Sequence, residues 1–247
     1  MRRMTMLRLL AACAFALAYA LPAQASCREV QFDDLPFTVC EVGADADLRL
    51  FHADAQGAVL GSFAKVDEVL AAEGKTLKFA MNAGMYHDDR APVGLLVTEG
   101  QERAGIVTQE GPGNFGLLPN GVFCIGKDFS VVESRAFKAA RPSCHFATQS
   151  GPILVIDGAL HPRFLPDSDS RFIRNGVGVS GDGKTAYFAI SGQAVNFDTF
   201  GRLFRDELGV PNALYFDGKI SRLFSPELGR NDFGFQMGPI VGLVVPK

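Results

Sequence analysis

The 247-residue chain has no tryptophan and only four histidines, and after residue 25 it has no apolar run long enough to cross a membrane. The histidines are scattered and no Cys-x-x-Cys pair occurs, so we predict neither a metal site nor a cofactor. The formal net charge of −3 argues against nucleic acid and anionic membrane surfaces as partners. No linker, low-complexity tract or internal repeat divides the chain, which favours one domain over residues 26–247.

The N-terminus has the three parts of an export signal. Three arginines within the first eight residues precede an apolar run over residues 9–21, and Ala23-Gln24-Ala25 supplies a small-x-small cleavage pattern. We therefore predict a signal peptide over residues 1–25 and an exported product, periplasmic or secreted. A lipoprotein is the alternative, because Leu10-Ala11-Ala12-Cys13 resembles a lipobox. Acylation at Cys13 would leave almost no apolar segment before the cut, so we favour the signal peptide.

Four cysteines remain after the predicted signal peptide, an even number that suits disulfides in an oxidising compartment. Three pairings of these cysteines are open. We favour Cys27 with Cys40 and Cys124 with Cys144. The first two lie symmetrically about Asp33-Asp34, so a hairpin at that point would set them opposite each other and near enough for a bridge.

Short β-branched and aromatic runs, separated by Gly, Asp and Pro, predict a chain made mostly of strands. Two helices are also predicted, over 63–72 and over 196–208, and the second begins with an asparagine cap and stops at Gly209. Many strands with few helices indicate an α+β fold, a mixed and largely antiparallel sheet core flanked by a few helices in a single domain. The predicted strands are 29–32, 37–42, 48–52, 77–81, 93–97, 121–125, 129–132, 153–156, 176–179, 186–191, 213–216, 220–224 and 240–245.

One stretch, Gly178 to Thr185, matches the phosphate-binding pattern GxxxxGK[ST]. That pattern needs a helix after the lysine, because the free N–H groups of the helix N-terminus bind the phosphate. Here the lysine is followed by AYFAIS, which is typical of a strand. We therefore predict that Ser180 to Lys184 form the tip of a hairpin that joins strands 176–179 and 186–191.

Polar side chains stand where predicted strands meet water. Asn82 and Asp217 each follow an apolar strand, whereas Gln149, Ser150 and Arg174 each precede one. Strands packed side by side bring such ends together, so these residues are candidates for one pocket. Each also has a plainer interpretation, as a turn residue, a loop residue or a surface charge. The planar fork of an arginine in this position is suited to an anion.

Six short motifs follow one another over most of the chain, from about residue 75 to the end. They are Asn82-Ala-Gly84-Met-Tyr86, Pro92-x-Gly94, Gln149-Ser-Gly-Pro152, Arg174-Asn-Gly-Val-Gly178, a helix ending at Gly209, and Ala213-Leu-Tyr-Phe-Asp217-Gly218. Their order and spacing resemble the phosphodiester glycosidase family, in which exported bacterial proteins are related to the animal uncovering enzyme, N-acetylglucosamine-1-phosphodiester alpha-N-acetylglucosaminidase.

Two motifs depart from the usual pattern of that family. The family has Asn-Gly-Gly where this chain has Asn82-Ala83-Gly84, and Asp-Gly-Gly-Gly-Ser where this chain has Asp217-Gly218-Lys219-Ile220-Ser221. The second departure places Lys and Ile side chains where the family presents bare backbone. It therefore changes how closely a phosphosugar approaches at this point.

The resemblance implies cleavage of a glycosidic bond whose leaving group is a phosphate. Arg174 would bind the phosphate oxygens, and Asp217 would act at the sugar carbon as nucleophile or as base on a water. Asn82 and Gln149 would hold sugar hydroxyls, and Tyr86 would offer an aromatic face to the ring. The implied catalytic residues are Asp217, Arg174 and Asn82, and the implied substrate-binding residues are Gly84, Tyr86, Gln149, Ser150, Gly151, Asn175, Gly176, Gly218 and Ser221.

Two other functions stay open. A non-catalytic envelope protein would bind a glycan or phosphosugar in the same pocket, and the altered Asp-Gly motif points in that direction. A metal-dependent hydrolase has only the loop Asp167-Ser168-Asp169 in its favour. The expected partner of the enzyme or of the binding protein is a carbohydrate or phosphosugar.

Overall fold

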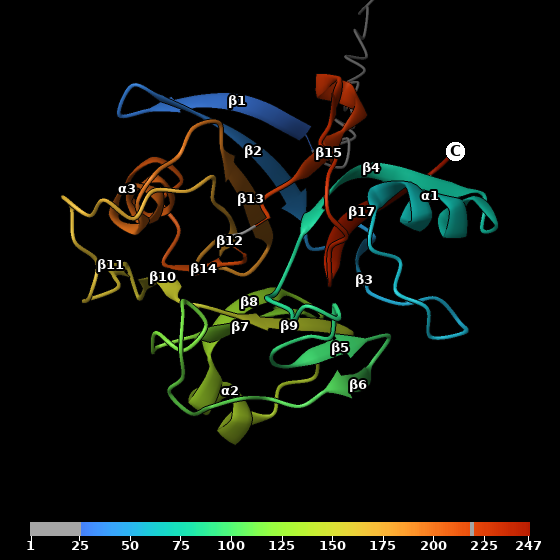
Figure 1. Cartoon of the computed structure of the whole chain (residues 1–247), viewed down its shortest axis with the longest axis horizontal. Helices are drawn as coiled ribbons and strands as arrows, with labels where there is room; N and C mark the ends of the chain where they lie inside the picture. The colour runs from blue at the N-terminus through green and yellow to red at the C-terminus, as the bar shows by residue number, and fades with distance from the viewer. Residues whose placement is uncertain (1–25, 218–219) are drawn as a thin grey trace, which may run out of the picture.

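Antiparallel strands are the main regular secondary structure of the molecule (Figure 1). The computed structural model describes residues 26–217 and 220–247, so the predicted signal peptide and the predicted site residue Gly218 lie outside the described residues. Every pairing between named strands in the described ranges is antiparallel, and the strands form three sheets. The α+β class with a largely antiparallel core is confirmed.

The sheets are built from strands that are distant in sequence. The seven-stranded sheet has the order β1 (Ser26–Phe32), β2 (Leu35–Gly43), β13 (Thr185–Ser191), β12 (Asn175–Val179), β14 (Asn212–Tyr215), β10 (Ile153–Ile156) and β11 (Ala159–Leu160). The second sheet has the order β16 (Arg230–Asn231), β15 (Leu223–Ser225), β4 (Lys75–Asn82), β17 (Ile240–Pro246) and β3 (Leu48–Phe51). The third has the order β6 (Gln101–Ala104), β5 (Leu96–Thr98), β9 (Phe146–Ser150), β7 (Gly121–Ile125) and β8 (Phe129–Glu133).

One hydrophobic core holds the three sheets together. Phe79 of β4, Phe123 of β7 and Phe188 of β13 come from different sheets and are at most 1 % exposed. The ring centroids of Phe79 and Phe188 are 5.4 Å apart, and those of Phe123 and Phe188 are 5.7 Å apart. Such aromatic contacts add to the free energy gained by burying the rings.

Three helices lie at the outside of the sheets. In Figure 1, α1 (Phe63–Ala71) lies beside β4, α3 (Phe197–Arg202) lies on the opposite side of the molecule, and α2 (Ser134–Ala140) lies next to β7 and β8. The predicted cap of α3 is confirmed, because Asn196 Oδ1 accepts a hydrogen bond from the backbone N–H of Thr199 at 2.9 Å. The chain continues from α3 as a π-helical turn, η1 (Leu203–Glu207), and reaches Gly209 with φ of 63°.

Both predicted disulfides are confirmed. Cys27 lies directly opposite Cys40 in the β1–β2 hairpin, and a disulfide joins them. The hairpin turns at Asp33 and Asp34, which both have positive φ. The second disulfide joins Cys124 of β7 to Cys144, just before β9.

The predicted hairpin at Ser180 to Lys184 is also confirmed. Strands β12 and β13 pair in register, from Val179 opposite Ala186 to Asn175 opposite Ile190, and no helix follows the lysine. Asp182 Oδ1 accepts hydrogen bonds from the Ser180 hydroxyl and from the Lys184 backbone N–H, at 2.6 and 2.9 Å. The match to the phosphate-binding pattern is therefore a turn sequence.

Several elements differ from the prediction. Predicted strand 93–97 begins only at Leu96, and predicted strand 220–224 begins only at Leu223. Sequence reasoning missed α2 and four strands, β6, β9, β11 and β16. The most consequential of these is β9, whose sequence FATQS lacks the apolar alternation of a typical strand although all five residues are buried.

Candidate functional site

Two asparagines from different sheets bind each other at the centre of the candidate site. Asn82 ends β4 and Asn175 begins β12, and neither is exposed to solvent. Asn82 Nδ2 donates to Asn175 Oδ1 at 3.2 Å, and Asn175 Nδ2 donates to the backbone carbonyl of Asn82 at 2.8 Å. Two of the predicted site residues thus join the second sheet to the seven-stranded sheet.

The segment after β14 folds onto this asparagine pair. Asn82 Oδ1 accepts the backbone N–H of Arg222 at 2.9 Å. Asn175 Oδ1 lies 3.2 Å from the Ser221 hydroxyl oxygen and 3.5 Å from the backbone nitrogen of Asp217. Asp217, Ser221 and Arg222 are therefore held at the same sheet ends as the two asparagines.

Arg174 lies inside a box of aromatic rings and is closed to solvent. Its guanidinium carbon is 3.7 Å from the ring centroid of Phe197, 5.3 Å from that of Tyr215 and 5.5 Å from that of Phe172. Burial lowers the pKa of this guanidinium, because desolvation disfavours the charged form. The rings offset part of that cost through their negative faces.

The hydrogen bonds of Arg174 leave one nitrogen unused. Nε donates to the carbonyl of Val195 at 2.8 Å and Nη2 donates to the carbonyl of Ser170 at 2.9 Å, whereas buried Nη1 has no hydrogen-bond partner. Within the described part of the chain no carboxylate forms an ion pair with Arg174. A buried cation without a counter-ion is energetically costly.

Tyr215 connects Arg174 to Asp217. Gly176 lies opposite Tyr215 in the β12–β14 ladder, so Arg174, two residues before Gly176, lies on the same face as Tyr215. Burial raises the pKa of Tyr215; the Arg174 guanidinium acts against that shift and the Asp217 carboxylate adds to it. Arg174 and Asp217 therefore lie at one end of the sheet and act on the same phenol. The hydroxyl of Tyr215 is buried, and apart from its interaction with the Arg174 guanidinium it has no hydrogen-bond partner among the described residues.

Tyr86 places a second unpartnered hydroxyl in this region. Its oxygen is buried without a hydrogen bond to any described residue, and burial together with the Asp217 carboxylate raises its pKa to about 12. Gly238 packs against the ring, and the guanidinium carbon of Arg90 is 5.6 Å from the ring centroid. The phenol stays protonated at neutral pH and can donate a hydrogen bond, although the sequence suggested the ring face as the contact.

The structure gives Gln149 a set of internal hydrogen bonds. Its Oε1 accepts the backbone N–H groups of Leu95 and Val107, each at 3.0 Å. Its Nε2 donates to the carbonyl of Val107 at 2.5 Å and to the hydroxyl of Ser134 at 2.7 Å. These bonds occupy both ends of the amide. The predicted contact of Gln149 with a sugar hydroxyl would require some of them to break.

The Ser150 hydroxyl also forms an internal hydrogen bond, and close packing explains why three of the predicted site residues are glycines. The Ser150 hydroxyl donates to the carbonyl of Phe216 at 2.5 Å, which ties β9 to the start of the Asp217 segment. A Cβ on Gly84 would lie 2.3 Å from the Thr148 hydroxyl, a Cβ on Gly151 would lie 2.6 Å from Asn120, and a Cβ on Gly176 would lie 2.5 Å from the carbonyl of Leu214. Neighbouring segments of the chain approach each other closely at these points.

Sequence reasoning missed four side chains of the site: Tyr215, Phe197, Phe172 and Arg222. The sequence could have indicated Tyr215. Residues two apart on a strand share a face, and Asp217, two residues after Tyr215, was already a candidate site residue. Phe197 and Phe172 come from α3 and from a loop, whose meeting with Arg174 has no local sequence signal. Arg222 lies within predicted strand 220–224 and was interpreted only as a strand residue.

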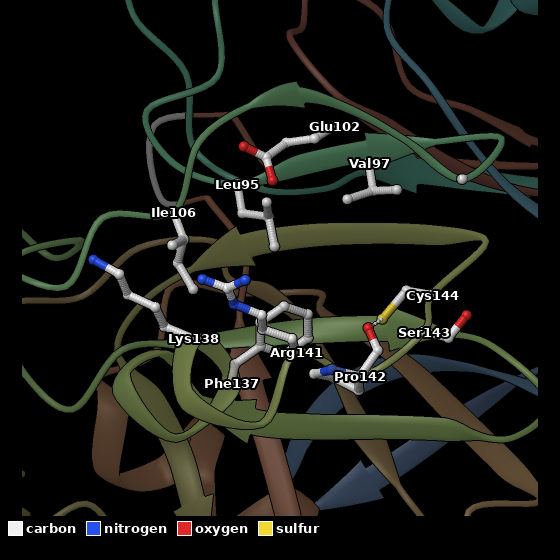
Figure 2. Close-up of a pocket in the computed structure, with 11 residues that line it drawn as sticks. Leu95, Val97, Glu102, Ile106, Phe137, Lys138, Arg141, Pro142, Ser143 and Cys144 are labelled. Carbon is white, nitrogen blue, oxygen red and sulfur yellow. Dashed lines mark hydrogen bonds between the residues drawn. The ribbon is translucent and has the colours of Figure 1, made fainter.

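A separate cleft lies on the third sheet (Figure 2). It has a volume of about 560 Å³ and lies between β5, β6 and α2. Leu95, Ile106 and Phe137 supply apolar lining, and Lys138 and Arg141 extend from the α2 side. The hydrogen bonds of Gln149 fix the 95–107 segment to the first residue of α2, so this buried amide holds two walls of the cleft together.

The described ranges, 26–217 and 220–247, contain neither a candidate metal site nor a candidate membrane-spanning helix. No group of three or more His, Cys, Asp and Glu side chains there has an arrangement that could hold a metal ion. No helix in these ranges is both long enough and apolar enough to cross a membrane.

Known proteins share both sequence and fold with this chain. The family model described as phosphodiester glycosidase matches residues 75–233. The uncharacterized Escherichia coli (strain K12) protein YigE is 35 % identical over 178 residues, which cover 72 % of this chain and 69 % of YigE. The region that the family model matches, residues 75–233, contains Asn82, Arg174 and Asp217.

Two solved structures share the fold. The first is the zebrafish N-acetylglucosamine-1-phosphodiester alpha-N-acetylglucosaminidase catalytic domain auto-inhibited by its pro-peptide, with a TM-score of 0.62 and 13 % identity over 89 % of this chain and 81 % of that one. The second is a Burkholderia pseudomallei K96243 protein described as exported, with a TM-score of 0.56 and 11 % identity over 85 % of this chain and 74 % of that one. At these identities the likeness concerns the fold.

Proposed function

This chain belongs to the phosphodiester glycosidase family, and from that premise we propose that it is an exported hydrolase that cleaves the bond between a sugar and a phosphate. Its substrate would be a sugar-1-phosphodiester or an envelope glycan that contains such a link. Two disulfides and the description of one structural relative as exported support an extracytoplasmic location.

One observation carries this proposal. Nη1 of Arg174 and the hydroxyl of Tyr215 are buried, and apart from the interaction of the Arg174 guanidinium with this hydroxyl they have no hydrogen-bond partner among the described residues; the Asp217 carboxylate acts on the same phenol. Buried donors are nearly always satisfied, so two adjacent ones suggest the place of an absent acceptor. A phosphate oxygen can accept hydrogen bonds from such donors, and its negative charge would supply the counter-charge that Arg174 lacks. The geometry supports an anion beside the aromatic box and a carboxylate close by.

The leaving group of the proposed reaction needs little help from a general acid. When the bond between the anomeric carbon and the phosphate oxygen breaks, the phosphate keeps the electron pair and leaves as an anion. Donors such as Nη1 of Arg174 would stabilise the charge on its oxygens. Asp217 would attack the anomeric carbon directly or take a proton from the attacking water, and its negative charge would stabilise the oxocarbenium-like transition state.

The two phenols would serve as neutral hydrogen-bond donors beside this carboxylate. Both Tyr86 and Tyr215 have raised pKa values, chiefly through burial, so neither ionises near neutral pH. A neutral phenol next to Asp217 adds no negative charge that would repel a phosphate. We propose that Tyr86 contacts the sugar, as the sequence suggested, through its hydroxyl.

The asparagine pair would position the reacting groups. Asn82 and Asn175 hold the backbone of Asp217 and Arg222 and the hydroxyl of Ser221, and their side chains are occupied in doing so. The role of Asn82 is then to fix Asp217 relative to Arg174, because displacement of a catalytic group by 1 Å can cost a hundredfold in rate. Ser150 supports the same segment through the carbonyl of Phe216.

A turnover assay separates this function from binding alone. The protein is incubated with sugar 1-phosphodiesters and aryl phosphodiesters of sugar 1-phosphates, and free reducing sugar is measured together with ligand binding. Saturable release of sugar supports the hydrolase. Saturable binding with no released sugar would instead support a glycan-binding or phosphosugar-binding envelope protein.

A further inference from the structure

A second arginine near Asp217 is almost buried and has no partner for its charge. Arg222 is 8 % exposed, and within residues 26–217 and 220–247 no hydrogen bond or ion pair engages its guanidinium. Only its backbone is held, through the N–H bond to Asn82. Burial lowers the pKa of this group, as expected for a charge removed from water.

Asp232, an acid whose charge acts on Arg222, already has other partners. Asp232 accepts the backbone N–H of Leu223 at 2.9 Å, and its two oxygens accept hydrogen bonds from Arg230 at 2.9 to 3.1 Å. Its charge reaches Arg222 only over a longer distance. All five N–H groups of the Arg222 guanidinium are therefore available, in a place where unpaired charge is costly.

The loop before β17 is shaped around this guanidinium. Gly234 has φ of 143°, which side chains rarely allow, and a Cβ at this position would lie 2.5 Å from Nη2 of Arg222. The phenylalanines on both sides of Gly234 point outward, with Phe233 95 % exposed and Phe235 78 % exposed. Two neighbouring exposed aromatic rings beside an unpaired cation are typical of a binding surface.

Tyr86 connects Arg222 to the proposed reaction centre. The Asp217 carboxylate and the Arg222 guanidinium both act on the Tyr86 phenol, whose hydroxyl has no partner in the described structure. Arg174, by contrast, lies in the box of Phe172, Phe197 and Tyr215. The two unpaired guanidinium groups thus have different surroundings.

We propose that Arg222, with Tyr86 and the Phe233-Gly234-Phe235 loop, forms a subsite for a second anionic group of the substrate, carried on the sugar. The proposal rests on the proposed function, in which Arg174 binds the single charge of the phosphodiester. The substrate class is then an acidic saccharide whose carboxylate or additional phosphate binds Arg222, while its sugar or the next one contacts the two phenylalanines. A guanidinium suits both anions because its fork matches two oxygens.

The test measures affinity for analogues that cannot be cleaved. In each, a CH₂ group replaces the oxygen between sugar and phosphorus, and titration calorimetry compares a neutral hexose with three acidic versions of it. These carry a C6 carboxylate, a C3 lactyl carboxylate or a C6 phosphate. We expect wild-type protein to bind at least one acidic analogue about tenfold tighter than the neutral one, the gain from one charge-assisted hydrogen-bonded pair. The preferred acidic analogue identifies carboxylate or phosphate as the source of the anion.

Three variants make the assignment specific. Arg222→Gln should abolish the preference while retaining affinity for the neutral analogue, Arg222→Lys should retain part of the preference, and Arg28→Gln on the exposed face of β1 should leave it unchanged. Thermal melting of each variant checks that the fold is intact. Because Arg222→Lys keeps the charge, it also separates loss of binding from loss of folding.

Other outcomes overturn the proposal in distinguishable ways. Equal wild-type affinity for neutral and acidic analogues, or a preference that survives in Arg222→Gln, would exclude the second anion site only. An equal loss of affinity for all analogues in Arg222→Gln would mean that both arginines bind one phosphate. Failure of wild-type protein to bind any of the analogues would overturn this subsite together with the phosphosugar function itself.

Discussion

The side-chain amide of Asn82 donates to the side-chain oxygen of Asn175, a residue 93 positions further along the chain, and Asn175 in return donates to the backbone of Asn82. This reciprocal contact holds the ends of β4 and β12 together. It also supports the backbone at Asp217 and Arg222, so the geometry of the proposed catalytic carboxylate depends on two amides whose side-chain nitrogen and oxygen atoms already form hydrogen bonds inside the protein.

Replacing Asn175 with alanine should destabilise the fold and reduce turnover together. The change leaves the side-chain amide and the backbone carbonyl of buried Asn82 without the partner that Asn175 supplies, which should cost about 3 kcal/mol in the free energy of unfolding. Urea denaturation of wild type, Asn175→Ala and the exposed control Asn231→Ala measures this. A loss below about 1 kcal/mol in Asn175→Ala would show that the pair contributes little to the fold.

Gln149 provides a nearly isosteric test of its internal role. Gln149→Glu removes the donor to the Val107 carbonyl and the Ser134 hydroxyl and places a charge at a position that is 1 % exposed. We expect a loss of about 3 kcal/mol in unfolding free energy, and faster hydrogen exchange in residues 95–107 and in α2. Gln101→Glu on exposed β6 is the matched control. Unchanged exchange in both segments would contradict the role assigned to this amide.

The raised pKa values of three tyrosines lead us to expect a loss of folding stability at high pH. Tyr86, Tyr187 and Tyr215 all have raised pKa values, chiefly through burial, and that of Tyr86 rises to about 12. Because the folded pKa values exceed the unfolded value near 10, the stabilisation is complete below pH 10 and is lost as pH rises through the folded pKa values. Absorbance at 295 nm should show tyrosinate forming only above pH 10. Normal titration of all three phenols at pH 10 in folded protein would refute the burial argument.

The outward phenylalanines should affect ligand binding without affecting stability. Phe233→Ala with Phe235→Ala removes two rings that contribute little to the core, since they are 95 % and 78 % exposed. The melting temperature should change by no more than a few degrees, whereas affinity for the acidic analogues should fall severalfold. Substitution of Val69, a half-exposed residue on α1, by alanine is the control. Unchanged affinity in the double variant would remove the loop from the binding surface.

The sequence predicted most of the sheet framework because strand boundaries leave local signals. Strands 121–125 and 153–156 have the predicted bounds, since β-branched and apolar residues begin and end there. The hairpin at Ser180 to Lys184 followed from turn chemistry. Strand β9 was missed because its Thr148, Gln149 and Ser150 are polar, and only tertiary contacts show that these polar atoms are satisfied inside the molecule.

The sequence predicted which residues form the candidate site better than it predicted what each residue does there. Asn82, Arg174 and Asp217 stand at strand ends, which sheet packing brings together. No local sequence feature indicated that Asn82 and Gln149 would form their hydrogen bonds inside the protein, because their partners belong to distant segments of the chain. Nor did it show that Arg222 would be buried without a counter-ion, since that depends on the conformation of Gly234.

The central claim, that Asp217 drives cleavage between a sugar and a phosphate, is tested most directly by the rate of sugar release from a sugar 1-phosphodiester. Wild-type protein and the control Asp88→Asn, changed in an exposed loop, should release sugar at equal rates. Asp217→Asn, melting at the same temperature, should be slower by roughly a hundredfold to ten-thousandfold, the range for removal of a positioned acid or base. A folded Asp217→Asn variant that releases sugar at the wild-type rate would contradict the account.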